Sequence, residues 1–168
     1  QDGEKARQED RRQEEVSLLL AHAAHGSGLY REAVELRRRV LRLPLGLDFT
    51  PEELLAEADD HCLVALYEGG LAGTLSLVEK LPDVKMRQVA VEQGLQGKGI
   101  GRRLVAFSEE FARTLGAQRM VLHARETAVP FYLAQGYARV GDRFEEVGIP
   151  HFRMEKELGI PGDANAVS

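Results

Sequence analysis

The sequence VAVEQGLQGKGIGRRL, residues 89–104, decides the fold, because a short apolar run passes directly into a glycine-rich stretch and then into a helical segment that opens with two arginines. A strand that enters a glycine loop and then a helix leaves several backbone N–H groups unpaired at the helix N-terminus, where the helix dipole adds partial positive charge. A phosphate group fits such a site. We expect three glycines of the loop to take positive φ and to let a pyrophosphate approach closely, with three basic residues at the rim. The glycines are Gly97, Gly99 and Gly101, and the basic residues are Lys98, Arg102 and Arg103.

The spacing of the glycines distinguishes between three kinds of phosphate-binding loop. The Walker motif is absent, because Gly99 follows Lys98 where a hydroxyl is required and Glu92 stands where the first glycine should be. The dinucleotide motif GxGxxG is also absent, because the third glycine arrives one residue early. The pattern QxxGxG is met by Gln96, Gly99 and Gly101. A plain strand–turn–helix joint is the alternative that needs no ligand.

This loop, placed after a strand of the VAV type, resembles the acetyl-CoA loop of the GNAT superfamily of N-acetyltransferases. The sequence AVPFYLAQGY, residues 128–137, resembles the last helix of that superfamily, in which a tyrosine close to the sulfur of the cofactor corresponds to Tyr132. Residues 148–154, GIPHFRM, resemble the closing strand of a subgroup of small bacterial members. The resemblance covers roughly residues 16–158. It implies that acetyl-CoA, as co-substrate, is bound by Val89, Ala90, Val91, Gln96, Gly97, Lys98, Gly99, Ile100, Gly101, Arg102 and Arg103.

The hydrophobic pattern predicts an α/β (α+β) fold. Residues 16–22 fit either a helix or a buried strand, and the resemblance assigns them to the first strand. Residues 29–43 have apolar side chains at helical spacing, and the arginines of this helix (Arg31, Arg38 and Arg42) are expected to form a solvated face. Further expected elements are a short helix over 50–58, strands over 62–67 and 71–78 joined by a hairpin turn, a strand over 86–91, a helix over 100–115, a strand around 120–122 and a helix over 128–136. Together they predict a GNAT-like, mixed and mostly antiparallel sheet flanked by helices on both faces.

The length of 168 residues predicts one domain, and the resemblance implies that residues 16–158 form an acyltransferase domain. A polar N-terminal tail (1–15), solvated or a frayed helix, and a C-terminal tail (159–168) are expected on either side. A formal net charge of −5 without a basic tail argues against nucleic-acid binding. The apolar run over 16–24 is too short to cross a bilayer, so no membrane association is expected. The single Cys62 and the lack of a secretory signal favour a cytoplasmic protein, and the histidines have no zinc-ligand spacing, so no metal is expected.

Acyl transfer to an amine requires a base and a proton donor. An amine with a pKa of about 10.4 is neutral in only about one part in two thousand at pH 7, a deficit of roughly 4 to 5 kcal/mol. Once the neutral amine attacks the thioester carbonyl, backbone N–H groups near Val91 are candidates to stabilise the charge that develops on oxygen. The CoA thiolate leaves more easily beside a proton donor, and Tyr132 is the candidate general acid. A tyrosine that merely packs in the core or on an adenine is the alternative.

The general base has several candidates. Glu92 lies at the start of the loop and Glu79 at the end of the preceding strand. The alternative for each carboxylate is an ordinary charged residue on the solvated surface. His123 ends an apolar strand and His151 opens the final one, and a histidine accepts protons near neutral pH, although a structural histidine is an equal alternative. His61 is a weaker candidate of the same kind.

The resulting prediction is an acetyl-CoA-dependent N-acetyltransferase that acts through a ternary complex on a small-molecule or protein amine, with a homodimer as one assembly left open. A non-catalytic acyl-CoA-binding or sensing module is the alternative from another class, and Tyr132 argues against it. Transfer of a longer acyl chain, or transfer to a hydroxyl, is the alternative among enzymes. Protein lysine, polyamine, amino-acid and aminoglycoside acceptors all remain open.

Overall fold

The computed structural model describes residues 2–159, and its centre is one seven-stranded sheet with the order β1-β2-β3-β4-β5-β7-β6. The strands are β1 (Leu18–Ala23), β2 (His61–Tyr67), β3 (Gly70–Lys80), β4 (Asp83–Val91), β5 (Arg119–Arg125), β6 (Ala138–Glu146) and β7 (Ile149–Glu157). Every neighbouring pair is antiparallel except β4 and β5, which α4 connects as a parallel pair. The predicted mixed and mostly antiparallel sheet is confirmed.

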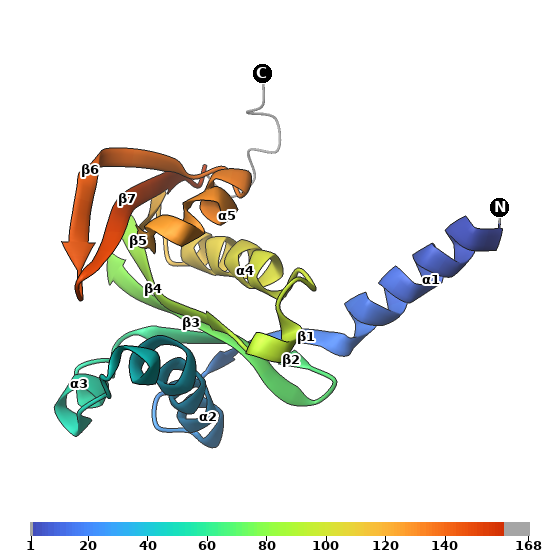
Figure 1. The fold of residues 1–168 in the computed structure, drawn as a ribbon, viewed down its shortest axis with the longest axis horizontal. Coiled ribbons are helices and arrows are strands. Elements are labelled where there is room, and N and C mark those ends of the chain that lie inside the picture. The colour runs from blue at the N-terminus through green and yellow to red at the C-terminus, as the bar shows by residue number, and fades with distance from the viewer. Residues whose placement is uncertain (1, 160–168) are drawn as a thin grey trace.

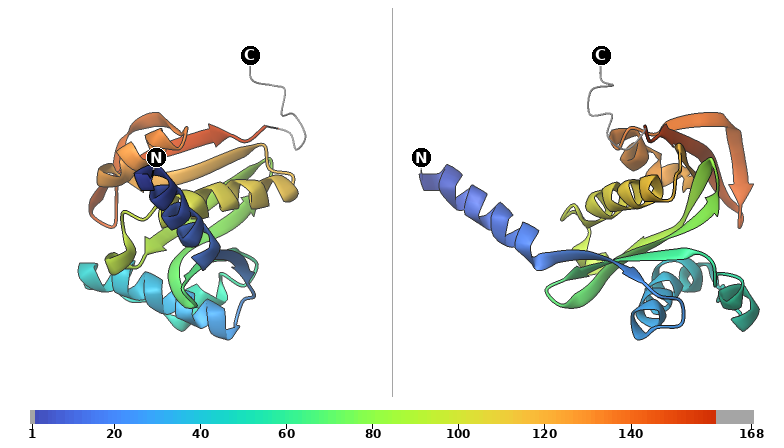
Figure 2. Two further views of the ribbon diagram at one scale, coloured as in Figure 1. Left: turned by 90° about the vertical axis from the view of Figure 1, so that its right-hand side faces the viewer. Right: turned by 180° about the vertical axis from the view of Figure 1, so that it is seen from behind.

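Helices cover both faces of the sheet, as predicted (Figure 1). The helices are α1 (Asp2–Ser17), α2 (Gly28–Arg37), α3 (Pro51–Leu55), α4 (Ile100–Thr114) and α5 (Val129–Ala134), and the shorter turns are η1 (Arg38–Arg42), η2 (Leu43–Leu45), η3 (Gln93–Leu95) and η4 (Glu126–Ala128). Helices α2 and α3 lie on one face, and α4 and α5 lie on the other (Figure 1). Figure 2 shows α1 extending away from the sheet. No helix within residues 2–159 has the length and apolar character needed to cross a membrane.

The first strand begins two residues later than predicted. Helix α1 runs through Ser17, and β1 starts at Leu18, where its pairing with Tyr67 begins. Strand β2 ends at Tyr67 because Glu68 takes a positive φ in the hairpin turn. Among the described residues Val16 therefore has no strand partner, which explains the shorter strand. The C-terminal tail predicted for residues 159–168 lies outside the described residues from 160 onward.

The predicted helix over 29–43 is divided in the structure. Helix α2 ends at Arg37, η1 continues as a wider π-helical turn, and η2 closes the segment as a 3-10 turn that contains Pro44. Proline has no N–H group, so a regular helix cannot continue through it. Gly46 then turns the chain with a φ of 71°. This irregular segment forms one wall of the cavity described below.

Strand β4 is irregular on both sides, and this irregularity makes room for a site. On the β3 side, Ser76 pairs with Arg87 and Thr74 pairs with Ala90, so that Gln88 and Val89 form a bulge. On the β5 side, pairing stops at Met86 and Leu122, after four positions. The later part of β4 therefore has no partner on its β5 side, and the two strands are free to separate there.

The core lies mainly between the sheet and α4. Ile100 and Leu104 are buried, as predicted, whereas Phe107 and Phe111 are only partly buried. Burial of a leucine side chain such as that of Leu104 contributes about 1.5–3 kcal/mol to stability. This packing holds the N-terminus of α4 firmly against the end of β4.

Candidate functional site

The glycine loop between β4 and α4 has the backbone that a phosphate site requires. Gly97 and Gly99 have φ values of 84° and 77°, which confirms the predicted positive φ at these two positions. The same prediction for Gly101 is wrong, because this residue lies inside α4. Gly101 instead allows close packing, since a Cβ placed there would lie 3.5 Å from Phe131 Cζ and 3.6 Å from Val91 Cγ2.

The N-terminus of α4 is open to an anion. Gly99 is its N-cap residue, and no side chain caps the helix. The first N–H groups of a helix have no acceptor within the helix, so those of Ile100, Gly101 and Arg102 are available to a ligand. Lys98 and Arg102 are exposed and Arg103 is half-buried, and none of the three forms an ion pair within residues 2–159. The loop therefore offers unpaired N–H groups and positive charge to an anion.

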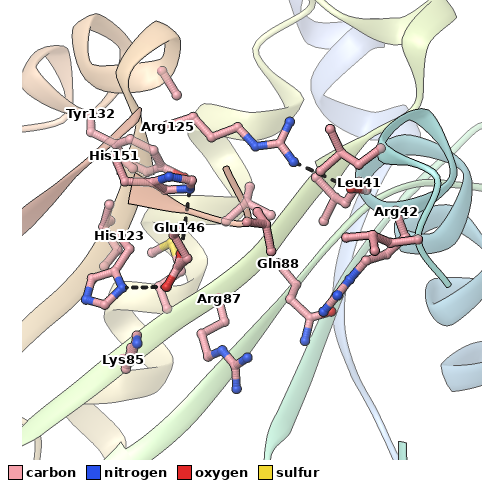
Figure 3. A pocket seen from close by; sticks show the side chains of 18 residues that line it. Leu41, Arg42, Lys85, Arg87, Gln88, His123, Arg125, Tyr132, Glu146 and His151 are labelled. Atoms are coloured by element: carbon pink, nitrogen blue, oxygen red, sulfur yellow. Dashed lines mark hydrogen bonds and ion pairs between the residues drawn. The ribbon is translucent and has the colours of Figure 1, made fainter. Parts of the chain in front are cut away.

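A cavity of about 390 Å³ opens where β4 and β5 separate. Its walls come from η1 and η2, from residues 85–89 of β4, from the end of β5, from α5 and from the β6–β7 hairpin. Of the residues predicted to take part in catalysis or cofactor binding, four line the cavity: Val89, His123, Tyr132 and His151 (Figure 3). Cavities of this size hold small molecules.

Tyr132 presents an unpaired hydroxyl to the cavity. Only 7% of the residue is exposed, and its ring packs edge-on against Phe131 and Tyr137 at centroid distances of 5.0 and 5.7 Å. Within residues 2–159 the hydroxyl has no hydrogen-bond partner. Burial raises the pKa of Tyr132 to about 12, so this side chain remains protonated at neutral pH. It can therefore donate a proton or a hydrogen bond to a ligand in the cavity.

Glu146 lies between the two cavity histidines (Figure 3). Its Oε1 is 3.2 Å from His123 Nδ1, and its Oε2 is 3.6 Å from His151 Nε2. The hairpin turn at Val147 and Gly148, both with positive φ, places Glu146 beside these rings. Burial alone would raise the pKa of Glu146, but the hydrogen bond from His123 and the charges of His123, His151 and Lys85 outweigh it and lower the pKa. Glu146 is therefore ionised at neutral pH.

The hydrogen bonds of the two histidines determine which nitrogen of each neutral ring carries the proton and which is unprotonated. An ionised carboxylate only accepts hydrogen bonds, so His123 carries its proton on Nδ1 and its Nε2 is unprotonated in the neutral ring. His151 Nδ1 is 2.7 Å from the carbonyl oxygen of Ile149, which fixes the proton on that nitrogen and leaves Nε2 to face Glu146. Each ring therefore has one nitrogen that can accept a proton: Nε2 of His123, which is not the nitrogen bonded to Glu146, and Nε2 of His151, which faces Glu146. We call His123, Glu146 and His151 the histidine–glutamate unit.

Two of the predicted bases lie outside the cavity. Glu92 forms a two-point ion pair with Arg39 of η1 at 3.0 and 3.1 Å, and the hydrogen bonds from Arg39 are the main reason why the pKa of Glu92 is lowered. Glu79 lies 3.5 Å from His61 Nε2, away from the cavity walls. Their assignment as bases stays a prediction, and the geometry favours the histidines instead.

A buried network under the bulge of β4 holds Gln88 in place. Gln88 Nε2 donates to Glu57 Oε1 at 2.9 Å, and Arg37, which is 1% exposed, donates to both oxygens of Glu57. The Tyr30 hydroxyl donates to the same carboxylate at 2.9 Å. Burial alone would raise the pKa of Glu57, but the hydrogen bonds from Arg37, Gln88 and Tyr30 lower it. Gln88 has a φ of 55°, and the network compensates for this strained backbone.

The sequence analysis missed Glu146, Glu57 and Arg42, all of which shape the site. Glu146 precedes a Val-Gly turn signal, but its position beside two histidines depends on the register of three strands. Arg42 was assigned to a solvated face, whereas the π-helical turn brings it to the cavity wall. Within residues 2–159 no group of three or more His, Cys, Asp or Glu residues is arranged to hold a metal ion.

The family of the chain follows from comparison with known proteins. The model of the acetyltransferase (GNAT) domain matches residues 48–158, well over half of the chain. The chain therefore belongs to the GNAT acetyltransferase family, which confirms the resemblance found in the sequence.

Several relatives and solved structures agree with this family. A putative N-acetyltransferase from Lactobacillus plantarum has a TM-score of 0.75 and 26% identity, covering 84% of this chain and 99% of that one. The Bacillus subtilis protein YyaT is 28% identical over 76% of this chain and 88% of its own length. The uncharacterized N-acetyltransferase YjcF from Bacillus subtilis is 32% identical over 44% of this chain, and the match spans about half of YjcF (53%). An aminoglycoside 6'-N-acetyltransferase complexed with coenzyme A shares the fold, with a TM-score of 0.70 at 15% identity, covering 86% of this chain and 99% of that one.

Proposed function

We propose that this protein transfers the acetyl group of acetyl-CoA directly to a primary amine within a ternary complex. One observation carries the proposal: Gly101 at the open N-terminus of α4 packs against Phe131, the residue before Tyr132. This close contact sets the phosphate-binding end of α4 beside the helix whose tyrosine faces the cavity. A cofactor held at the loop can therefore extend toward the Tyr132 hydroxyl.

The chain supplies separate groups for binding the cofactor. The N–H groups that begin α4 would bind the pyrophosphate, and Lys98, Arg102 and Arg103 would add positive charge around it. Beyond Met86, β4 has no partner on its β5 side, and backbone N–H groups around Val89 and Val91 would donate hydrogen bonds to the thioester oxygen there. The thioester supplies an activated acetyl carbon.

The histidine–glutamate unit would take the proton that the attacking amine loses. The amine enters neutral, its nitrogen forms the new bond to the acetyl carbon, and one proton passes to an unprotonated Nε2 of the unit. Glu146 stabilises the positive charge that the ring then carries. As the carbon–sulfur bond breaks, the Tyr132 hydroxyl donates a hydrogen bond to the departing thiolate. The histidine then releases the proton taken from the amine to solvent, and the CoA thiolate takes up a proton from solvent. The products are the N-acetylated amine and free CoA, and no covalent acyl-enzyme is needed.

Calorimetry with acetyl-CoA tests the binding half of the proposal. Gly99→Glu places a side chain and a negative charge in the phosphate site, and we expect it to abolish acetyl-CoA binding. Gly116→Glu is the matched control, because Gly116 also has a positive φ (89°) and open space around it but lies at the other end of α4. If Gly99→Glu and Gly116→Glu bind acetyl-CoA equally well, the phosphate site is assigned wrongly.

Release of free CoA across a panel of amines tests the chemical half. We expect wild-type protein to release CoA only when a suitable amine is present, with one N-acetylated product formed for each CoA released. Longer acyl-CoA donors and hydroxyl acceptors in the same assay would reveal the alternatives within the enzyme class. Binding of acetyl-CoA without transfer to any acceptor would instead indicate a binding or sensing module.

A further inference from the structure

Four cationic side chains line the cavity without an ion-pair partner among the described residues. Lys85, Arg42, Arg87 and Arg125 form no ion pair within the described part of the chain. The only acidic residue in the lining is Glu146, which the two histidines already engage. This concentration of positive charge contrasts with a net charge of −5 for the whole chain.

Within η1, only the arginine at the cavity wall has no acidic partner among the described residues. Arg38 and Arg39 belong to the same turn as Arg42, and each has a carboxylate partner, Asp48 at 2.8 Å and Glu92 at 3.0 Å. Of the three arginines of η1, the one that lines the cavity is thus the one without an acidic partner. A chain with 27 acidic residues could have supplied one.

Two of these arginines are held in place by contacts that leave their charge intact. The Arg42 guanidinium lies 4.5 Å from the ring centroid of Phe49, a cation–π contact. Arg125 donates to the carbonyl oxygen of Leu41 at 3.5 Å, which links β5 to η1 across the cavity (Figure 3). A guanidinium fixed in this way can bind a carboxylate with little loss of side-chain entropy.

The charges also act on one another. Burial and the positive charge of Arg87 lower the pKa of Lys85, against the opposing effect of the negative charge of Glu146. Asp60 lies close enough to Arg87 to interact electrostatically, but it is outside the cavity lining and forms no ion pair with it within residues 2–159. An anion in the cavity would relieve this mutual repulsion.

We propose that the acceptor is a small amine that also bears a carboxylate, and that Arg42, Arg87 and Arg125 bind this carboxylate. Figure 3 shows Arg42 across the cavity from the histidine–glutamate unit, so the two ends of such a molecule have separate sites. This inference rests on the proposed acetyl transfer and names its acceptor class. Polyamines and aminoglycosides carry only positive charge, and the same arginines would repel them.

Matched acceptors test this inference directly. Each set contains an amino acid, its carboxamide and the amine left by decarboxylation, for example phenylalanine, phenylalaninamide and phenethylamine, or lysine, lysinamide and cadaverine. Other standard amino acids and β-alanine extend the panel. We expect kcat/KM from CoA release to be at least about 10-fold higher for the carboxylate than for either analogue, the usual scale for a charged hydrogen bond. The carboxamide has the less basic amine, so a larger fraction of it is neutral at pH 7. This difference works against the expected preference for the carboxylate.

Single variants connect the preference with the arginines. Arg42→Gln, Arg87→Gln and Arg125→Gln should each reduce the preference for the carboxylate about 10-fold while changing kcat/KM for the carboxamide little. Arg139→Gln is the control, because Arg139 is exposed on β6 outside the cavity. Thermal denaturation of each variant separates lost recognition from lost folding. Equal use of all three analogues, or a preference that none of the three cavity variants alters, would overturn the inference and leave acetyl transfer standing.

A binding measurement keeps the inference separate from the chemistry. N-acetyl amino acids and their amides are titrated by calorimetry into protein saturated with CoA. Tighter binding of the carboxylates, weakened by the cavity variants, supports the anion site even if no amine in the panel releases CoA, in which case the proposed acetyl transfer fails alone. Equal binding of acids and amides overturns the inference.

Discussion

At the scale of single residues, the Tyr132 hydroxyl is the group whose removal is most informative. Tyr132→Phe keeps the ring between Phe131 and Tyr137 and removes the unpaired donor. A pKa of about 12 lies above that of a thiol, about 8.5, so the hydroxyl stabilises the leaving sulfur mainly by donating a hydrogen bond. We expect kcat to fall about 10²-fold, with little change in acetyl-CoA affinity.

Steady-state CoA release and calorimetry measure the two quantities for Tyr132→Phe. Tyr67→Phe serves as control, because Tyr67 lies outside the cavity lining and keeps its ring. A loss of affinity with kcat unchanged would make Tyr132 a binding residue. The effect should also shrink for a thioester with a better leaving group, because such a group needs less stabilisation.

Glu146 gives a second residue-scale prediction, in the rate of transfer. Its carboxylate lies 3.2 Å from His123 Nδ1 and holds the ring in place, so Glu146→Gln should lower kcat about 10-fold or more through loss of ring orientation. Glu145→Gln, an exposed neighbour, should leave kcat unchanged. Steady-state CoA release measures both variants, and an unchanged kcat for Glu146→Gln would contradict the role given to Glu146.

Single positions also show which residues of the candidate site could be predicted from the sequence. Tyr132, His123 and His151 were identified because each stands beside a recognisable strand or motif. Glu146 was missed because its role depends on its distances to His123 Nδ1 and His151 Nε2, 3.2 and 3.6 Å. These contacts exist only after β5, β6 and β7 have paired. Arg42 was misplaced because helical periodicity assumes a regular helix, and the wider turn of η1 rotates the side chain toward the cavity.

At the scale of elements, Glu57 connects α2, the segment after α3 and the bulge of β4 through buried hydrogen bonds. Glu57→Gln leaves Arg37 buried without a counter-charge, and we expect the free energy of unfolding at pH 7 to fall by about 3–5 kcal/mol. Urea denaturation measures this difference. Glu52→Gln, on the exposed side of α3, should change stability by no more than about 0.5 kcal/mol.

The same variant predicts a pH dependence with a definite sign. The pKa of Glu57 is lower in the folded protein than its ordinary value of 4.5. The stabilisation is therefore complete above about pH 4.5 and is lost as the pH falls through the folded-state pKa. The stability difference between wild type and Glu57→Gln should accordingly shrink in acid. A difference that grows as the pH falls would show that the ionised carboxylate does not stabilise the fold.

Elements were predicted well where one periodicity dominates and poorly where a strand or helix is irregular. The face of α4 that contains Ile100 and Leu104 repeats regularly and was recognised. The bulge at Gln88 has no local turn signal, because glutamine in a run of strand formers gives no indication of a positive φ. The buried Glu57 network that compensates for this strain comes from a distant segment, so only the tertiary structure could reveal it.

At the scale of the whole molecule, the acidic chain must still attract a cofactor with several phosphate charges. We expect Arg102→Gln combined with Arg103→Gln to weaken acetyl-CoA binding about 10-fold or more and to reduce its salt dependence, while acetyl-pantetheine binding changes little. Arg11→Gln combined with Arg12→Gln removes the same charge from exposed positions of α1 and is the control. Calorimetry over a range of salt concentrations measures both.

The outcomes separate a local from a global effect. If both double variants weaken acetyl-CoA binding equally, overall charge controls the association and the loop arginines have no special role. If acetyl-pantetheine binding is weakened as much as acetyl-CoA binding, the loop arginines act through the folding of α4.

The projecting helix α1 and the sheet should differ in how strongly their backbone amides are protected from hydrogen exchange. Residues 2–12 of α1 are exposed, and a helix of this length is only marginally stable in water without tertiary packing. Its amide hydrogens should therefore exchange with deuterium within the time typical of a free peptide. Those of β3 and of residues 83–86 of β4, which have strand partners on both sides, should exchange only through global opening. A mass-spectrometric exchange map would then divide the chain at Leu18, where sheet pairing begins.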